Sequence, residues 1–187
     1  MAIRIKAAAV TGEKQIDIKE LETGDLRGSE ALIKVRAVAL CTLEQRAFRG
    51  EMKMPLPFLG GYEVAGDIVA LGPGANRKIW KEGQRVAVRM LYSCGECYNC
   101  RTGHTNMCTQ AQRKPVREGM IPGPGGLCDQ IVVSTKDLFL IPDGISYEEA
   151  SLTEPLACCV HSIEIGDIQL GDDVVVIGGG IMGINHV

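Results

Sequence analysis

The sequence predicts a mainly β domain, built as a sandwich or barrel, that leads into helices and the first strand of a parallel sheet. Three observations predict it. Short apolar or alternating runs, separated by turns rich in glycine and proline, fill the first 140 residues. A helical spacing of apolar residues then follows a capping pattern near residue 146. Finally, a β-branched apolar run ends in glycines near residue 178.

Five runs in the first part of the chain read as strands. In the second run, Lys34 and Arg36 alternate with the apolar residues Ile33, Val35 and Ala37, which is the period of two expected of a strand with one buried face. The predicted strands are KAAAV, ALIKVRAVAL, EVAGDIVALG, QRVAVRM and DQIVVS.

Over residues 144–166 the apolar residues recur with helical spacing. Ser146 followed by Glu149 is a capping-box pattern, so a helix is predicted to start there. Pro155 should either start a second helix or kink a continuous one. We therefore divide the chain into a β domain over residues 1–150 and a second part over residues 151–187.

Composition describes an ordinary globular protein. Its 187 residues are 45% hydrophobic and 23% charged, with a net charge of −3, so no basic excess favours nucleic acid or an anionic membrane as a partner. The N-terminus lacks a secretory apolar region, and no apolar run reaches membrane-spanning length. We expect a cytoplasmic protein with no nucleic-acid or membrane partner, whose eight cysteines serve metal or redox chemistry rather than disulfides.

The strongest pattern is a group of four cysteines within fifteen residues, in a lobe over about residues 92–112. Four thiolates can surround zinc at about 2.3 Å in a closed tetrahedral shell, which is typical of a structural site. Gly95 and Gly103 suit the turns that the spacing demands. The predicted zinc ligands are Cys94, Cys97, Cys100 and Cys108.

Two alternatives to this zinc site remain. An iron–sulfur cluster also uses four cysteines, but the ferredoxin run has a shorter last gap and a proline after its fourth cysteine, where this chain has Thr109. The cysteines could also stay reduced without a metal. His104 lies inside the lobe, and we interpret it as a solvated loop residue because the cysteines already fill the shell.

The run DDVVVIGGGIMG near the C-terminus matches the dinucleotide-binding fingerprint of a strand followed by glycines. Gly178 would allow a tight turn, Gly180 would let the backbone approach a pyrophosphate, and Gly183 would let the next helix pack closely. The acidic residue that holds the ribose should fall about 20 residues later. We therefore expect the nucleotide site to be incomplete in these 187 residues.

The order of these motifs resembles the N-terminal part of the zinc-containing medium-chain dehydrogenase family, closest to its polyol branch of sorbitol and threonine dehydrogenases. The resemblance covers essentially the whole chain. It implies a GroES-like, partly open β-barrel catalytic domain with a structural zinc, followed by helices and the first strand of a truncated Rossmann fold. The matching motifs are ALCTLEQRAFRG, GGYEVAGDIVALG, the four-cysteine lobe, GGLCDQIVV, TEPLACCVH and VVVIGGGIMG.

The resemblance also implies a second, catalytic zinc. Carried over residue by residue, its ligands are Cys41, the residue at position 62, Glu63 and Glu154. An open zinc site acts as a Lewis acid and lowers the pKa of a bound alcohol, so that its alkoxide can release hydride. The implied substrate is a small secondary alcohol or polyol, and NAD or NADP would bind only in a full-length protein.

Four positions depart from the family pattern. The family has histidine where this chain has Tyr62, and a phenol must lose a proton with a reference pKa of about 10 before it can bind zinc. The hydroxyl that relays the substrate proton is replaced by Leu43, although Thr42 precedes it. Glu44 replaces an aspartate, and Arg46 stands where polyol-type members often have histidine.

The candidate ligands also have simpler interpretations. An isolated cysteine such as Cys41 is often a small buried hydrophobe, and a carboxylate such as Glu154 is favoured at a helix start by the helix dipole. His161 and Cys158 would share a helix face with Glu154, either as a replacement metal site or, as we favour, as a packing face.

Two functions remain in view. The chain could be the N-terminal catalytic domain of an NAD(P)-dependent alcohol dehydrogenase, inactive in isolation. It could instead be a zinc-stabilised scaffold that has lost the catalytic metal. Residues 173–177, a buried type of strand without its sheet, are expected to be disordered, to pair in a homo-oligomer, or to associate with another chain.

Overall fold

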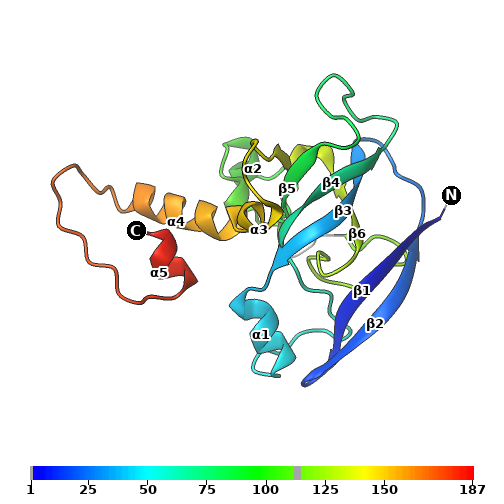
Figure 1. Ribbon diagram of the computed structural model, residues 1–187, viewed down its shortest axis with the longest axis horizontal. Helices are drawn as coiled ribbons and strands as arrows, with labels where there is room; N and C mark the ends of the chain where they lie inside the picture. Colours follow the sequence, from blue (N-terminus) through cyan, green and yellow to red (C-terminus); the bar gives the residue numbers. More distant parts are fainter. Residues whose placement is uncertain (1, 112–114) are drawn as a thin grey trace.

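The computed structural model describes residues 2–111 and 115–187 and consists of a β domain, two helices that extend from it, and a C-terminal tail (Figure 1). The elements are β1 (Ile3–Gly12), β2 (Gln15–Thr23), β3 (Glu30–Ala39), α1 (Thr42–Phe48), β4 (Glu63–Leu71), β5 (Arg85–Arg89), α2 (Tyr98–Arg101), η1 (Thr105–Met107), β6 (Gln130–Ser134), η3 (Thr135–Asp137), β7 (Leu138–Leu140), α3 (Tyr147–Ser151), α4 (Thr153–Ile165) and α5 (Ile181–Asn185).

The β domain is a partly open barrel of antiparallel strands. Five strands form one sheet in the order β6-β3-β4-β5-β7, while β1 and β2 form a separate ribbon. Single bridges join β1 to the rest, from Ala7 to Cys128 and from Val10 to Phe58, so the sheet does not close fully. The fold class predicted from the sequence is confirmed for this domain.

Apolar side chains of the five-stranded sheet form the core. Alternate residues of each strand point inward, so Ile33 on β3 and Val86 on β5 are completely buried while Lys34 and Arg36 face solvent. The core cluster contains Ala31, Ile33, Val64, Ile68, Leu71, Ala75, Val86, Val88, Ile131 and Leu138. The alternation that predicted β3 therefore also places its apolar side chains in the core.

Two strands of the fold were absent from the sequence prediction. The two isoleucines of β2, Ile16 and Ile18, are both more than half exposed. Pairing with β1, rather than burial of these side chains, therefore holds β2 in place. The left-handed residue Lys14 makes the tight turn between them. β7 has three residues, which is too short to produce a pattern.

The helical region follows the prediction closely. Ser146 and Glu149 form the expected capping box at the start of α3, with both reciprocal hydrogen bonds present. Pro155 lies in the first turn of a separate helix, α4, where a proline removes no needed hydrogen bond. Of the two alternatives, a second helix is thus confirmed. None of the described helices is long and apolar enough to cross a membrane.

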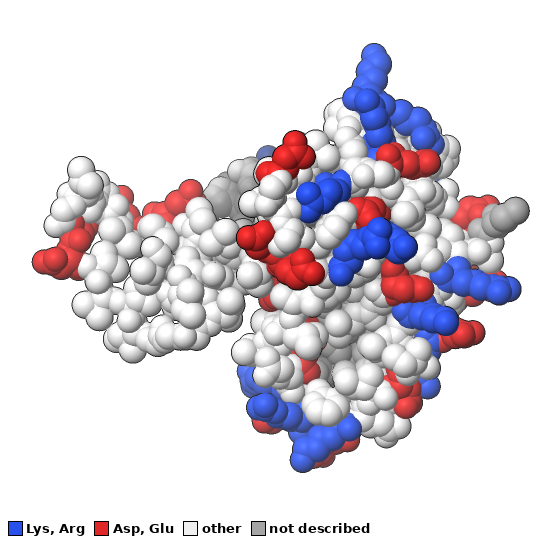
Figure 2. Space-filling model, in the orientation of Figure 1, with Lys and Arg blue, Asp and Glu red and all other residues white. Residues whose placement is uncertain are grey.

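The predicted strand over residues 173–177 needs correction. Residues 173–177 form no strand, and Val175 and Ile177 are 83% and 96% exposed. A strand of this buried type gains its stability from parallel neighbours on both sides, and none of the strands described here lies beside it. In Figure 2 the C-terminal end of the molecule is largely uncharged, and its few charged side chains are acidic.

A polar cluster fixes α3 on the sheet and gives a pH prediction. The Tyr147 hydroxyl and the Arg36 guanidinium both donate to Asp67 on β4, the latter at 2.6 Å, and Arg85 stacks on the Tyr147 ring at 4.6 Å. Burial raises the pKa of Asp67, but the hydrogen bonds from Tyr147 and Arg36 outweigh it, so the pKa lies below its usual 3.8.

Because the folded pKa of Asp67 is depressed, its contribution to stability is present above pH 3.8 and is lost as the pH falls through the folded pKa. We expect Asp67→Asn to destabilise the protein by about 1 kcal/mol at pH 7, and by less at pH 3. Urea unfolding of both proteins across this range measures the difference. An equal loss at both pH values would contradict the ionic role of Asp67.

Candidate functional site

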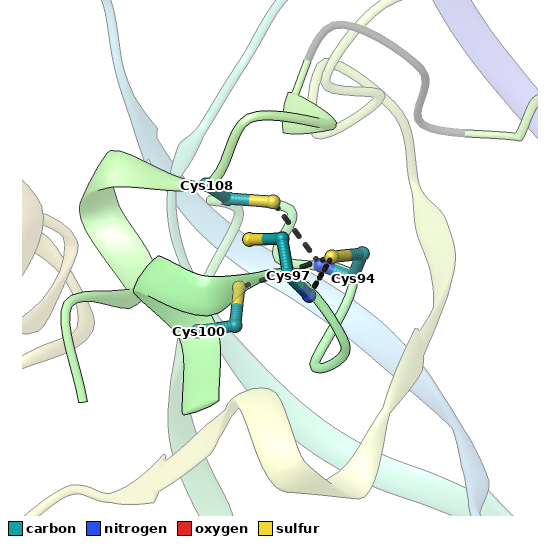
Figure 3. A group of neighbouring side chains, drawn as sticks. All are labelled: Cys94, Cys97, Cys100 and Cys108. Carbon is teal, nitrogen blue, oxygen red and sulfur yellow. Dashed lines mark hydrogen bonds between the residues drawn. The ribbon is translucent and has the colours of Figure 1, made fainter. Parts of the chain in front are cut away.

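The four-cysteine lobe is a loop between β5 and β6 that contains α2 and η1 (Figure 3). Gly95 and Gly103 adopt left-handed backbone conformations, with φ of 76° and 91°, as the turns between the cysteines require. Figure 3 shows all four side chains directed toward one point. Residue 112, the predicted end of the lobe, lies outside the described residues.

The sulfur atoms are spaced as a metal site demands. All four lie within 4.8 Å of one another, and the sulfurs of Cys94 and Cys100 are 3.9 Å apart. Tetrahedral ligands at the zinc–sulfur distance are separated by about 3.8 Å. Among the described residues, this is the one group of three or more cysteine, histidine and acidic residues whose ligand atoms come this close together.

Backbone N–H groups stabilise negative charge on these sulfurs. Cys108 accepts from the N–H groups of Cys94 and Gln110 at 3.4 and 3.3 Å, which lowers the pKa of its thiol. Backbone N–H groups likewise lower the pKa of Cys97, whereas desolvation and the neighbouring sulfurs raise that of Cys100. The cluster therefore favours some thiolates, and a divalent cation would relieve the repulsion that opposes the rest.

His104 takes no part in this cluster. Its ring is exposed and lies 3.3 Å from the Thr102 hydroxyl, as expected of a solvated loop residue.

The second group of predicted ligands comes from three elements. Cys41 is the N-cap of α1, Glu63 is the first residue of β4, and Glu154 lies in the first turn of α4. The pairing of Ala39 with Glu63 places the end of β3 beside the start of β4, which explains why Cys41 and Glu63 interact. The fold thus collects residues that are far apart in the sequence.

Burial and nearby carboxylates raise the pKa of two acids in this group. Burial raises the pKa of Glu63, and the nearby carboxylates of Glu154 and Glu44 raise it further. Burial also raises the pKa of Glu154, with Glu44 as the second cause. Each acid is therefore held in an environment that disfavours its own negative charge.

Tyr62 lies at the same place, half-buried beside Cys41. Burial raises the pKa of the phenol, and the hydrogen bond with Cys41 and the nearby carboxylates raise it further. Tyr62 therefore keeps its proton at neutral pH and can donate a hydrogen bond. A neutral phenol is a poor zinc ligand, so Tyr62 is a weaker zinc donor than the histidine of the family pattern.

Glu44 was noticed in the sequence only as a departure from the family pattern. It is 6% exposed, and its Oε1 accepts a hydrogen bond from the Gly61 N–H at 2.9 Å. Gly60 makes room for it, since a Cβ there would lie 2.7 Å from Glu44 Cγ. The glycine pair before Tyr62 thus allows the buried Glu44 carboxylate to lie beside the site. This pair is the sequence signal from which the position of Glu44 could have been predicted.

Cys158 was considered as part of a helix face and proves to be close to the predicted ligands. Its sulfur is 4.0 Å from Glu154 Oε1, one helical turn away. Burial raises the pKa of the Cys158 thiol, and the nearby groups, Glu154 first among them, raise it further. His161 differs, because its Nδ1 lies 3.9 Å from Glu164 Oε2 and no contact joins it to Glu154 among the described interactions.

Comparison with known proteins identifies the domain. The model of the alcohol dehydrogenase GroES-like domain matches residues 27–143, which is more than half of the chain. The chain belongs to this family. Sorbitol dehydrogenase of Bacillus subtilis (strain 168) is 33% identical to this chain over 187 residues, which cover 98% of this chain and 51% of that protein.

Solved structures agree with the GroES-like assignment. An acetophenone reductase from Geotrichum candidum NBRC 4597, in complex with NAD, has a TM-score of 0.84 and 28% identity over 98% of this chain and 53% of that one. A cobalt and zinc bound thermostable alcohol dehydrogenase from Pyrobaculum aerophilum has a TM-score of 0.81 and 26% identity over 98% and 55%. The chain spans about half the length of these proteins.

The residues predicted to hold zinc and the dinucleotide suit those cofactors to different degrees. The lobe fits zinc in donor type and spacing. At the second position Cys41, Glu63 and Glu154 have suitable donor atoms, but Tyr62 does not. The glycine turn also fits its predicted role in part, because Gly178 has a φ of 110° and a Cβ on Gly183 would lie 1.8 Å from the Gly178 oxygen. Gly180 caps α5.

Proposed function

We propose that residues 1–150 are the zinc-binding catalytic domain of an NAD(P)-dependent alcohol or polyol dehydrogenase that oxidises a small secondary alcohol. Residues 151–187 are the linker helix and the glycine turn of the nucleotide-binding part. The supporting observation is that Glu63 interacts with both Cys41 and Glu154. Cys41 and Glu63 lie within the family-matched residues 27–143, and Glu154 lies in the first turn of α4. The protein would act in the cytoplasm.

Two zinc ions have separate roles in this proposal. The lobe holds a structural ion through Cys94, Cys97, Cys100 and Cys108. The second ion, when bound, supplies Lewis-acid chemistry that lowers the pKa of the substrate alcohol. Cys41 and Glu154 offer it a thiolate and a carboxylate, and Glu63 adds a carboxylate from the start of β4. Tyr62 donates a hydrogen bond and orients Cys41.

Hydride transfer needs a complete dinucleotide site, and residues 151–187 form only part of one. Gly178, Gly180 and Gly183 would cradle a pyrophosphate at the start of α5, but the run before them forms no strand in the described residues. We expect the 187-residue chain to reduce no NAD or NADP with any polyol.

A metal count tests the proposal. We expect two zinc ions per chain in protein purified without chelators, one of them removed by a mild chelator and the other retained in the closed lobe. Elemental analysis before and after chelation measures both. No zinc at all would contradict the proposal. Robust NAD reduction by the 187-residue chain would contradict the prediction that its nucleotide site is incomplete.

A non-catalytic scaffold is the second candidate, and the substitution at Tyr62 favours it. The phenol stays protonated, so the family's imidazole ligand has no direct replacement at that position. A scaffold predicts one zinc ion per chain, in the lobe.

A further inference from the structure

Strand β2 has an open edge. It pairs with β1 along its length, and no other described strand lies beside it (Figure 1). The even-numbered residues of β1 bond away from β2, because the Ala8 N–H donates to the Leu127 carbonyl and Val10 exchanges two backbone hydrogen bonds of 2.9 Å with Phe58. Successive residues of an antiparallel strand bond to opposite sides, so the odd-numbered residues of β1 are the ones that bond to β2.

The same alternation identifies the free backbone groups of β2. The odd-numbered Ala7 of β1 lies opposite Lys19, so the odd-numbered residues of β2 bond to β1. The even-numbered residues direct their N–H and C=O groups to the open edge. Outside the β1–β2 pairing, none of the described backbone groups bonds to Ile16, Ile18 or Glu20.

The open stretch is short and has its midpoint at Ile18. Beyond residue 20 a loop covers the strand, since a Cβ on Gly119 would lie 1.9 Å from the Glu22 carbonyl oxygen. At the other end the chain turns at Lys14, whose φ is 55°. The edge is therefore open over residues 16–20, which is long enough to bind one extended segment by backbone hydrogen bonds.

Exposed apolar side chains accompany the open edge. Ile16 and Ile18 are 53% and 69% exposed. Ile18 also borders an apolar hollow that Ala8, Val38 and Leu127 line. Unpaired backbone groups beside exposed aliphatic side chains are the features of a strand that pairs with another strand.

The charges on β2 favour a second copy of the same strand. Asp17 and Lys19 are half-buried, and the Lys19 Nζ lies 3.4 Å from Asp17 Oδ2. If two copies pair antiparallel with Ile18 opposite itself, Asp17 of each copy lies opposite Lys19 of the other, in the non-hydrogen-bonded pairs whose side chains are closest. A shift of two residues either way places Asp17 opposite Asp17 or Lys19 opposite Lys19, and like charges directly opposite are destabilising.

We propose that two copies of this chain dimerise by antiparallel pairing of their β2 edges about a two-fold axis at Ile18. Every contact then occurs twice. Ile16 of each copy lies diagonal to Ile18 of the other, so four isoleucines form one apolar row, and the two charge pairs lie on the opposite face. None of the residues that carry the proposed function lies on β2, so this interface goes beyond that function.

Six variants of the full 187-residue chain test the interface. Ile18→Lys places two lysines at the axis, Asp17→Lys and Lys19→Asp each make both charge pairs repulsive, and the double variant Asp17→Lys with Lys19→Asp makes them attractive again. Ile79→Lys is the matched control, since Ile79 is 54% exposed but lies between β4 and β5. Val175→Lys tests the other exposed apolar segment, since Val175 is 83% exposed. Sedimentation equilibrium over a series of protein concentrations measures dimerisation, and circular dichroism verifies folding.

We expect the wild type, Ile79→Lys and Val175→Lys to form dimers as concentration rises, and Ile18→Lys to stay monomeric. Each single charge variant should raise the dissociation constant about tenfold, and the double variant should restore it. A wild type that stays monomeric would overturn the proposal, as would a dimer that survives Ile18→Lys or a double variant as weak as the single ones. A dimer that Val175→Lys abolishes and Ile18→Lys retains would overturn it and assign the contact to residues 173–177.

Discussion

Cys100→Ser is expected to release the metal ion of the lobe and to lower the free energy of unfolding by about 4 kcal/mol or more, the range reached when a bound metal is lost. The four sulfurs lie within 4.8 Å of one another. Without one of them the ligand shell cannot close, and the three remaining sulfurs repel one another when they are thiolates. The loop has little else to hold it, because α2 has four residues and none of them is buried.

Elemental analysis and urea unfolding measure these two effects. Cys128→Ser is the matched control, since the Cys128 thiol is also partly buried and donates to the carbonyls of Gly125 and Gln130, which a serine hydroxyl can replace. The control should keep its metal content and lose little stability. If Cys100→Ser retained the wild-type zinc content and protease resistance, the lobe would not be a zinc site.

The lobe could be predicted from the sequence because its chemistry is local. Its four cysteines lie within fifteen residues, so their spacing alone limits how they can meet. The strands β3, β4 and β5 were predictable for a similar reason, since β3 carries its own alternation and β4 and β5 carry their own apolar runs. The capping box at Ser146 is likewise a signal four residues long.

The second group could not be assembled in this way. Cys41, Glu63 and Glu154 come from α1, β4 and α4, and only the resemblance to a family indicated that they meet. The parts of that group that differ from the family needed the structure. Glu44 is buried because Gly60 leaves room for its side chain and the Gly61 N–H donates to it. Cys158 approaches Glu154 because the two residues lie four apart on α4.

Strand β2 and the run at residues 173–177 show the two ways in which a local pattern misleads. β2 has a polar, half-exposed sequence and is a strand because β1 pairs with it along its length. Residues 173–177 have a strong strand pattern and form none, because a buried strand depends on neighbours that the described residues do not provide. Strand formation is thus decided by partners as much as by propensity.

The second large effect is expected at Gly66 in the middle of β4. Gly66→Ala should lower the free energy of unfolding by about 3 kcal/mol, because the new methyl group would meet backbone rather than a movable side chain. An added Cβ would lie 2.2 Å from the Lys34 carbonyl oxygen and 2.9 Å from Ile33 Cγ2. The register between β3 and β4 shifts at this point, between Val35 and Ala37, so the strands are already as close as glycine allows.

Gly179→Ala is the matched control for this experiment, because a Cβ there meets nothing within 4 Å and its backbone is not left-handed. We expect that control to change stability by no more than about 0.5 kcal/mol in urea unfolding. An equally stable Gly66→Ala protein would contradict the close approach of β3 and β4.

The metal content of Gly66→Ala then separates the two sites. Glu63 begins the strand that contains Gly66, and Ala39 beside it leads to Cys41, so a displaced β4 should separate Glu63 from Cys41 and weaken binding of the second ion. The lobe carries all its ligands on its own loop and should keep its ion. One zinc ion per folded chain is therefore expected. Retention of two would show that the second ion does not depend on the β3–β4 junction, and loss of both would show that the lobe depends on the sheet.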